Sequence, residues 1–388
     1  IEALNENDYE VKYSITSKYS RRMNNKNFFN AGIIQDLFDV KYVGKQYSQT
    51  DGKYLYYMDN NDYMIFSRTF FEWQHKFSDN LSLNTGIHSG LFFLNNSYTI
   101  EPRTALKWQL DERQILSFGF GLHSQTQQKA VYIMQELVDT TNNEYLRTNT
   151  NLGFSRSMHL VAGYDRNVGN QQRVKLEVYY QRLFDIPVSS QNPVYSILNS
   201  GGDFSFFVYH NLLNQGGGEN MGIELSLEKY LSEGFYYLLT ASLFDAKYYG
   251  YDGVKRNSQF NNNFVLNALL GYEISFNQRN ALAFDIKAVW AGGTRYVPIN
   301  EELSIINDGV VYDWDNAYKE RYPDYFRVNA RITYRLNGKK VNQEWGLDIQ
   351  NLTNHQNIFT QNWNNETKQI STAYQMGFMP MMTYRIHF

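Results

Sequence analysis

The stretch FRVNARITYRLN, residues 326–337, alternates apolar and polar side chains along its whole length. The apolar positions are Phe326, Val328, Ala330, Ile332, Tyr334 and Leu336, and between them lie Arg327, Asn329, Arg331, Thr333, Arg335 and Asn337. Because successive side chains of a β-strand point to opposite faces, the pattern predicts a strand with one apolar and one charged face. A tilted strand crosses a bilayer in about 9–11 residues, whereas strands of globular proteins peak at about 5–6. This stretch is long enough to span, although a strand of a soluble sandwich has the same period.

The same alternation recurs along the chain, with turn-rich breaks between copies. It predicts about fifteen strands, near 7–19, 28–40, 62–76, 80–94, 98–110, 114–125, 156–168, 172–184, 218–231, 234–247, 261–276, 280–294, 324–337, 343–355 and 374–388. Connections after even-numbered strands are long, near 41–61, 126–155, 185–217, 248–260, 295–323 and 356–373, with the one near 95–97 as the exception. Connections after odd-numbered strands are mostly short. Short turns on one side and long loops on the other are typical of outer-membrane barrels, so the sequence predicts an all-β, transmembrane, antiparallel up-and-down β-barrel.

Charged residues of the predicted strands fall on their polar faces. They include Glu224, Glu228, Asp285, Glu344 and Asp348, together with Lys175, Lys287, Arg327, Arg331 and Arg335. A charge that faces lipid at the bilayer midplane costs about 2–4 kcal/mol. We therefore expect these side chains to line an enclosed space that holds water or a polar plug.

The composition of the 388 residues excludes several classes of protein. Tyr, Phe and Trp number 32, 26 and 6, and such side chains favour pleated sheets. The sequence has no apolar run of the length, about 18 residues, that a membrane-spanning helix needs. A net charge of -3 without a basic stripe speaks against nucleic acid as a partner. The absence of cysteine excludes disulfides, zinc–thiolate sites and thiol nucleophiles.

An odd number of strands is unusual, because a bacterial barrel normally closes with an even number and leaves both termini in the periplasm. About seven further strands upstream would give the 22 strands of plugged outer-membrane transporters. We therefore expect residues 1–388 to be the transmembrane β-barrel portion of a longer protein, about fifteen strands of a 22-stranded barrel. The signal peptide, the plug domain and the first strands would lie outside it.

Several segments resemble the TonB-dependent receptor family, especially its Bacteroidota type with a carboxypeptidase-regulatory-like domain. EPRTALKWQLDERQILSFGFGLHS, residues 101–124, resembles a hairpin of the family, and LDIQNLTNHQNI, residues 347–358, is similar to its penultimate strand. Further similar segments are GIELSLEKYLSEGFYYLLTASLFDAKY, residues 222–248, and GVKRNSQFNNNFVLNALLGYE, residues 253–273. The C-terminal strand, with Tyr384, Ile386 and Phe388 on one face, looks like the signal that the barrel-assembly machinery recognises.

The resemblance implies an outer-membrane receptor that admits a large solute, such as a siderophore, cobalamin or a peptide, through a plugged barrel. Its implied partners are outer-membrane lipid and lipopolysaccharide, TonB through the absent N-terminal part, the barrel-assembly machinery, and lipoproteins. Two alternatives stay open. The chain could be a self-contained passive outer-membrane channel, or a scaffold subunit of a larger outer-membrane complex.

The predicted long loop near 187–217 is rich in aromatic residues. We expect Tyr195, Phe206, Phe207 and Tyr209 to contact the ligand, because long loops on a rigid scaffold commonly carry binding function. In the alternative interpretation, these side chains pack against neighbouring loops or against the aromatic girdle of the barrel.

The sequence predicts no catalytic site, no metal site and no cofactor. The seven histidines lack metal-ligand spacing, and lumen-lining positions explain them better. The cluster Asp59-Asn60-Asn61-Asp62 lacks the glycine and the distal glutamate of an EF-hand loop, although a surface calcium stays open. No motif identifies a nucleophile or a water-activating pair, which the outer-membrane hydrolases require.

Overall fold

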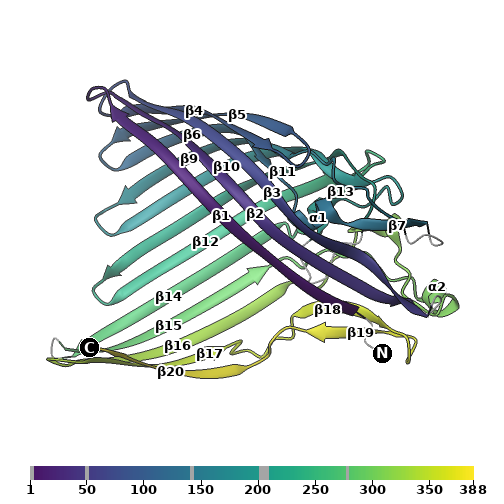
Figure 1. The fold of residues 1–388 in the computed structure, drawn as a ribbon. Helices are drawn as coiled ribbons and strands as arrows, with labels where there is room; N and C mark the ends of the chain where they lie inside the picture. The colour runs from purple at the N-terminus through teal and green to yellow at the C-terminus, as the bar shows by residue number, and fades with distance from the viewer. Residues whose placement is uncertain (1–3, 49–51, 140–143, 201–208, 277–278) are drawn as a thin grey trace.

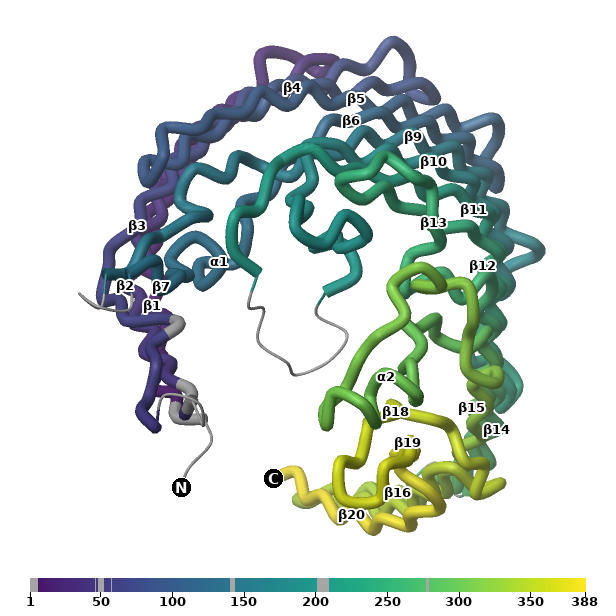
Figure 2. The backbone as a smooth tube through the Cα atoms, turned by 90° about the vertical axis from the view of Figure 1, so that its right-hand side faces the viewer, coloured from purple at the N-terminus to yellow at the C-terminus, as the bar shows by residue number. Residues whose placement is uncertain are grey.

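The computed structural model describes residues 4–48, 52–139, 144–200, 209–276 and 279–388. Within these ranges one antiparallel sheet of 16 strands curves around an open interior (Figures 1 and 2). Fifteen of the strands follow one another in chain order, and the short β13 (Lys255–Asn257) pairs with β12 outside this order. The fifteen are β1 (Leu4–Arg22), β2 (Asn27–Ser48), β3 (Lys53–Lys76), β4 (Leu81–Phe92), β5 (Ser97–Asp111), β6 (Gln114–Gln125), β9 (Ser155–Val168), β10 (Gln172–Ser189), β11 (Leu212–Ser232), β12 (Phe235–Tyr249), β14 (Phe264–Phe276), β15 (Asn280–Ala291), β16 (Tyr325–Asn337), β17 (Asn342–Gln350) and β20 (Met379–His387).

The strand order confirms the predicted all-β, up-and-down fold. Among the described residues, β1 pairs only with β2 and β20 only with β17, so both ends of the order are sheet edges. Figure 2 shows the curve open between these two strands.

Several predicted strand boundaries are wrong by five residues or more: β10 continues to Ser189, β11 begins at Leu212 and β17 ends at Gln350. Two others change how the connections are understood. The long connection expected near 41–61 is mostly a continuation of β2 and β3, which pair from Asn27 opposite His75 to Ser48 opposite Lys53. The alternation weakens there because this part of the hairpin extends past the apolar band, where no lipid constrains the side chains. The last strand begins at Met379 and not near 374, because Tyr374 pairs with Ile358 in a separate hairpin of β18 (Ile358–Asn364) and β19 (Gln369–Tyr374).

The two faces of the sheet differ as the alternation predicts. On β16, Ile332 is 42% exposed on the outer face, whereas the neighbouring Thr333 is 5% exposed on the inner face. Residues opposite one another in the register point to the same face of the sheet, so the inner face continues from strand to strand. Arg331, for example, lies opposite both Asp285 and Asp348. The charged residues predicted for the lumen all share the face of Arg331.

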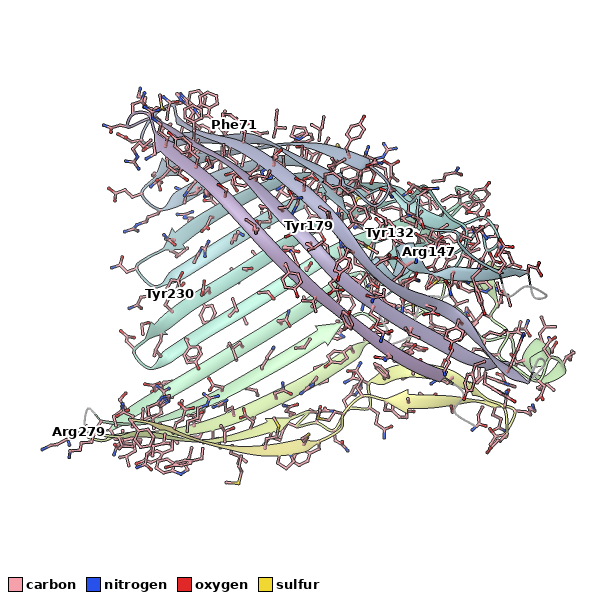
Figure 3. All side chains as sticks on the ribbon, viewed as in Figure 1. Phe71, Tyr132, Arg147, Tyr179, Tyr230 and Arg279 are labelled. Atoms are coloured by element: carbon pink, nitrogen blue, oxygen red, sulfur yellow. The ribbon has the colours of Figure 1, made fainter. Side chains whose placement is uncertain are left out.

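The two ends of the strands are unequal. Short turns join the strands at one end, where Figure 3 shows Tyr230 and Arg279, and the long connections lie at the other end with Tyr132 and Arg147. The long connections also contain α1 (Lys129–Ile133), β7 (Gln135–Asp139), β8 (Glu144–Arg147), η1 (Ile197–Asn199), α2 (Glu301–Ile306) and η2 (Trp314–Asn316). No helix in the described ranges is long and apolar enough to cross a membrane.

Aromatic side chains form a row on the outer face near the short turns. Trp345 of β17 lies between Tyr334 of β16 and Tyr384 of β20, with ring centroids 5.8 Å and 5.5 Å away. The three residues lie opposite one another in the register. Such a row is typical of the aromatic girdle at a membrane interface, where the rings lie at the level of the lipid headgroups.

Candidate ligand-binding site

The long connections fold back over the inner face of the sheet. Figure 2 shows α1 and β7 inside the curve formed by the strands. We call the folded parts of connections 126–154 and 190–211 the loop cap. Their position places loop side chains above the polar lumen, where a solute entering from the long-loop end meets them first.

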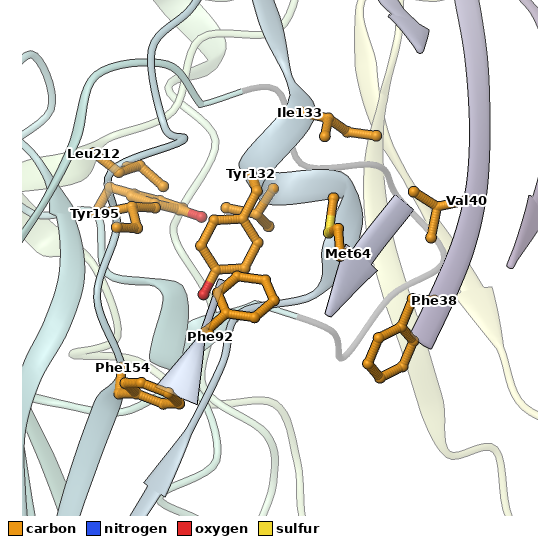
Figure 4. Close-up of a cluster of buried hydrophobic side chains, with 11 residues drawn as sticks. Phe38, Val40, Met64, Phe92, Tyr132, Ile133, Phe154, Tyr195 and Leu212 are labelled. Carbon is orange, nitrogen blue, oxygen red and sulfur yellow. The ribbon is translucent and has the colours of Figure 1, made fainter. Parts of the chain in front are cut away.

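A hydrophobic cluster fastens the loop cap to the wall (Figure 4). Its wall members are Phe38, Val40, Met64 and Phe92, and its members from the connections and the start of β11 are Val131, Tyr132, Ile133, Leu152, Phe154, Tyr195 and Leu212. Burying one large apolar side chain contributes about 1.5–3 kcal/mol, so the cluster favours the ordered, docked state of these loops. The apolar wall residues lie on the inner face of β2, β3 and β4, where the sequence pattern alone predicts polar contacts with the lumen.

Tyr132 of α1 lies at the centre of this cluster. Its side chain is 1% exposed, and its ring centroid lies 5.1 Å from that of Phe92. The backbone N–H of Gln127 donates to its hydroxyl oxygen over 3.0 Å. Burial raises the pKa of Tyr132 to about 12. The phenol is therefore neutral at every physiological pH and acts as a packing group.

Two buried asparagines fix the loop backbone. The side-chain amide of Asn60 in β3 donates to the carbonyl oxygen of Ile133 over 2.8 Å. Asn149 donates to the carbonyl oxygen of Tyr209 over 2.8 Å and accepts from the backbone N–H of Leu212 over 2.9 Å. Buried backbone groups must be paired, and these amides pair groups that regular strands would otherwise satisfy.

The predicted ligand-contacting tyrosines, Tyr195 and Tyr209, lie against each other in the loop cap. Their rings stack with centroids 3.6 Å apart and an interplanar angle of 21°. Tyr195 is 7% exposed and its hydroxyl bonds with the Ser200 hydroxyl over 3.1 Å, so its ring supports Tyr209 from below. Tyr209 is only partly buried. Phe206 and Phe207 lie outside the described residues, and a direct contact of any of the four with ligand stays a prediction.

A second group of aromatic residues comes from the connection after β15, in which the sequence showed only a long loop. Tyr296 and Tyr322 stack with centroids 4.4 Å apart and an interplanar angle of 11°. Burial raises the pKa of both Tyr209 and Tyr322, and the nearby phenol of Tyr312 adds to each increase. Tyr312, which is 44% exposed, therefore lies within electrostatic range of both Tyr209 and Tyr322. We call Tyr209, Tyr312, Tyr322 and Tyr296 the tyrosine surface.

Buried contacts hold the two connections together beneath the tyrosine surface. Val194 packs with Ala317 and Tyr318 in a small cluster around Tyr248 of β12. The hydroxyl of Tyr248 donates to the carbonyl oxygen of Val194 over 3.0 Å. The guanidinium of Arg295 donates to the carbonyl oxygens of Asn261 and Lys319, each over 3.0 Å. The tyrosine surface thus rests on a packed base and can offer ring faces and hydroxyl groups to a solute.

The wall beneath the loops carries paired charges. Asp36 of β2 is 1% exposed and accepts hydrogen bonds from Arg68 over 2.5 Å and from Ser14 over 2.6 Å, while Lys12 lies 3.2 Å away. On the opposite side of the curve, Arg331 contacts Glu344 and Asp348 over 3.3 Å and 3.4 Å. These ion pairs confirm the predicted ionic character of the inner face.

Two neighbouring hollows lie on the inner wall of β3, β4 and β5. Their volumes are about 330 Å³ and 410 Å³, and both are lined by Glu72, His88 and Arg103. His88 contacts Glu72 over 3.3 Å, and Arg103 contacts the buried Glu101 over 2.5 Å. A polar solute that passes the loops would find hydrogen-bond donors and acceptors of both signs on this wall.

No group of three or more metal-ligating side chains occurs in the part of the chain that the structure describes. His123 and His159 lie side by side with ring centroids 4.7 Å apart, but no third ligand joins them. The cluster Asp59-Asn60-Asn61-Asp62 was the candidate for a surface calcium site. In it, Asp62 forms an ion pair with Arg147 of β8 over 2.6 Å, which connects β3 to the loop cap.

The predicted assembly-signal residues Tyr384, Ile386 and Phe388 lie at the end of the edge strand β20. They are 55%, 42% and 96% exposed. Tyr384 and Ile386 share the outer face with Met382, and Phe388 follows the last paired residue, His387. Their recognition by the assembly machinery stays a prediction.

Residues 4–352 match a protein family described as TonB dependent receptor-like, beta-barrel. No curated protein matches the chain. Solved structures similar to it include the ferric yersiniabactin uptake receptor FyuA from Yersinia pestis, at 11% identity and a TM-score of 0.67, with 100% of this chain and 56% of that chain covered. The outer membrane transporter YddB from Escherichia coli has 12% identity and a TM-score of 0.64, with coverage of 97% and 54%. BauA, the ferric preacinetobactin receptor from Acinetobacter baumannii, has 11% identity and a TM-score of 0.62, with coverage of 99% and 54%. The chain thus spans about half the length of these proteins.

Proposed function

Because the chain belongs to the TonB-dependent receptor β-barrel family, we propose that it forms the larger part of the wall and the ligand-contacting loops of a receptor that takes up a large solute. Its location is the outer membrane, where the family and the similar solved structures are found. The inner wall carries ion pairs and the outer wall exposes apolar and aromatic side chains. This distribution suits a barrel whose lumen is polar and whose outer face meets lipid.

The observation that carries the proposal is the tyrosine surface held above a polar lumen. Tyr209 and Tyr312 belong to different connections, and they lie within electrostatic range of each other at the long-loop end. Aromatic rings provide large contact areas with little loss of side-chain entropy, and their hydroxyl groups can fix the orientation of a ligand. The site therefore favours recognition of a sizeable solute at the long-loop end, before the solute reaches the lumen.

The rest of the barrel is part of the same proposal. The sheet edges at β1 and β20, and the coverage of about half of each solved neighbour, support a complete barrel of about 22 strands around a plug domain. We propose TonB as the energising partner through that N-terminal part, and membership of the Bacteroidota type. Lipopolysaccharide, the barrel-assembly machinery and lipoproteins are the further proposed partners.

The proposed solute is a siderophore, cobalamin, a peptide or a similar large molecule. Two of the solved neighbours are named as receptors for ferric yersiniabactin and ferric preacinetobactin, which supports testing ferric siderophores first. Both names denote ferric complexes, and a broad aromatic surface offers a sizeable complex of this kind contact area.

Uptake measurements in cells test the proposal. Radiolabelled ferric siderophores, cobalamin and peptides are supplied singly to cells with and without TonB. We expect one class to be accumulated only when TonB is present, while its binding to the cell surface persists in both strains. Accumulation that continues at the same rate without TonB would instead establish a passive channel.

Substitutions then test the site. Tyr209→Ala and Tyr312→Ala should each weaken binding of the accumulated solute by about 30-fold, the effect of losing an aromatic hot spot of about 2 kcal/mol. Tyr230→Ala is the matched control, because Tyr230 is 50% exposed at the short-turn end, far from the loops (Figure 3). Equal affinities for all three variants would rule out the tyrosine surface as the binding site.

A further inference from the structure

The outer face of the sheet carries an apolar groove of about 500 Å³ across β5, β6, β9 and β10. Its walls are formed by Leu106, Phe118, Phe120, Leu160, Ala162 and Val178. This volume lies within the about 300–1,000 Å³ of small-molecule sites. The groove is an open depression of the outer face and not an enclosed cavity.

A single small side chain creates the depth of the groove. Ala162 of β9 lies opposite Phe118 of β6 on one side and Val178 of β10 on the other. Its methyl group leaves open the space that a longer side chain would fill between these two neighbours. Phe118 and Val178 are 49% and 44% exposed, so both stand above the floor of the groove.

Polar and aromatic groups follow on the same face toward the short turns. Tyr164, two residues along β9, donates its hydroxyl to the side-chain oxygen of Gln114 over 2.7 Å. Trp108 lies at the same level on β5 and is 47% exposed. Arg166 follows after two more residues and is exposed. From the interior of the membrane to its surface, the outer face thus presents first the apolar groove, then the aromatic residues Trp108 and Tyr164, and then the cation Arg166.

The guanidinium of Arg166 forms no ion pair or hydrogen bond among the residues that the structure describes. Its charge does interact with the Asp111 carboxylate of the nearest turn. That carboxylate accepts its hydrogen bonds from the backbone N–H of Arg113 over 2.7 Å and from the amide of Gln114, so the guanidinium keeps its donors for another partner. A cation at this level pairs well with a lipid phosphate.

The spacing matches the dimensions of a lipid. Four residues of a strand rise about 13 Å, and a strand tilt of about 35–45° makes Ala162 about 10 Å deeper in the membrane than Arg166. One leaflet of the hydrocarbon core is about 15 Å thick, half of the full core. A lipid with its phosphate at Arg166 therefore has the upper part of an acyl chain at the level of Ala162.

We propose that the groove holds one acyl chain of a phospholipid from the leaflet at the short-turn end, with the phosphate of that lipid paired to Arg166. The aromatic row formed by Trp108 and Tyr164 borders the glycerol region between them. This lipid is held at a defined place and stays bound when the surrounding bilayer is removed. It belongs to the wall and is independent of solute uptake.

Native mass spectrometry tests the proposal. The protein, purified from native outer membranes, is delipidated in detergent and titrated with dioleoyl phosphatidylglycerol. We expect one lipid to bind more tightly than all others. Ala162→Phe should weaken this binding by about tenfold, because the ring fills the groove. Arg166→Gln should weaken it by about fivefold, because a surface cation loses its phosphate.

Two matched variants complete the experiment. Ala241→Phe changes an alanine on the outer face of β12, opposite Leu225 and outside the groove, and Arg279→Gln removes a cation of another short turn (Figure 3). Neither should alter the affinity. Folding of each variant is checked by its heat-modifiable electrophoretic mobility. If Ala162→Phe does not fold, Ala162→Leu is used in its place. Equal lipid affinity in all variants, or recovery of lipopolysaccharide in place of phospholipid, would overturn the proposal.

Discussion

Replacing Tyr132 with alanine should release the loop cap from the wall and leave the sheet intact. The side chain is 1% exposed and contacts a ring of β4, so its removal leaves a large cavity. Substitution of a fully buried aromatic residue by alanine costs about 3–5 kcal/mol. Because Tyr132 belongs to a connection and not to a strand, this cost falls on the loop cap. Local opening should therefore become about 150 to 5,000 times more frequent.

Hydrogen exchange measured by mass spectrometry follows this opening directly. Amides of residues 127–134 should lose protection in Tyr132→Ala by the same factor, while amides of the central strands exchange as before. Tyr132→Phe is the control, since it keeps the ring and removes only the acceptor for the Gln127 N–H, worth about 1 kcal/mol. Unchanged protection of 127–134 in the alanine variant would show that the cluster does not fasten the cap. An equal loss in cap and strands would show that the two do not unfold separately.

Three further predictions concern the wall and one outer loop. Asp36→Leu should destabilise the barrel by about 1.5–3 kcal/mol in urea unfolding, because Arg68 and Ser14 lose a buried charged acceptor while Arg68 itself stays partly solvated. A loss no larger than that of Asp36→Asn would contradict the role of the charge. Ile286→Arg, at the middle of the outer face of β15, should cost about 2–4 kcal/mol in the same assay in a bilayer, whereas Ile286→Leu should be neutral; a neutral arginine variant would refute the lipid-facing assignment. Hydrogen bonds from Arg256 chiefly lower the pKa of Asp252 from its ordinary 3.8, so this contact stabilises the loop above that pH and is lost as the pH falls through the lowered value. Backbone amides of the loop should therefore exchange faster in acid, and the same profile in Asp252→Asn would contradict this.

The sequence was sufficient to predict the strands of the wall because they follow one local rule, the alternation of apolar and polar side chains. Alternation in 326–337 assigns each side chain of β16 to a face, and the paired charges of Arg331 then follow from register alone. Strand boundaries were less certain where lipid no longer imposes the rule. The β2–β3 hairpin continues past the apolar band, and its outer part therefore reads as a loop.

The site was only partly predictable because its geometry depends on contacts between distant connections. Aromatic density singled out Tyr195 and Tyr209, but nothing in the local sequence indicates that the first is buried beneath the second. Tyr312 was missed because its role depends on residues of another connection, which the local sequence does not show. The density of tyrosines in 295–323 was one available signal. Apolar residues on the inner face, such as Phe38, were a second signal, since they interrupt the polar face where a loop covers it.

The hydrophobic cluster under the loop cap has a consequence for how such a protein can diversify. Among the described residues, four buried side chains of β2, β3 and β4 anchor the loop cap, Phe38, Val40, Met64 and Phe92, while Tyr248 of β12 holds the second connection. Substitutions in the exposed parts of the loops leave those four anchors untouched. New specificities can therefore arise by exchange of loop sequence on an unchanged wall, whereas a change at an anchor requires a matching change in α1.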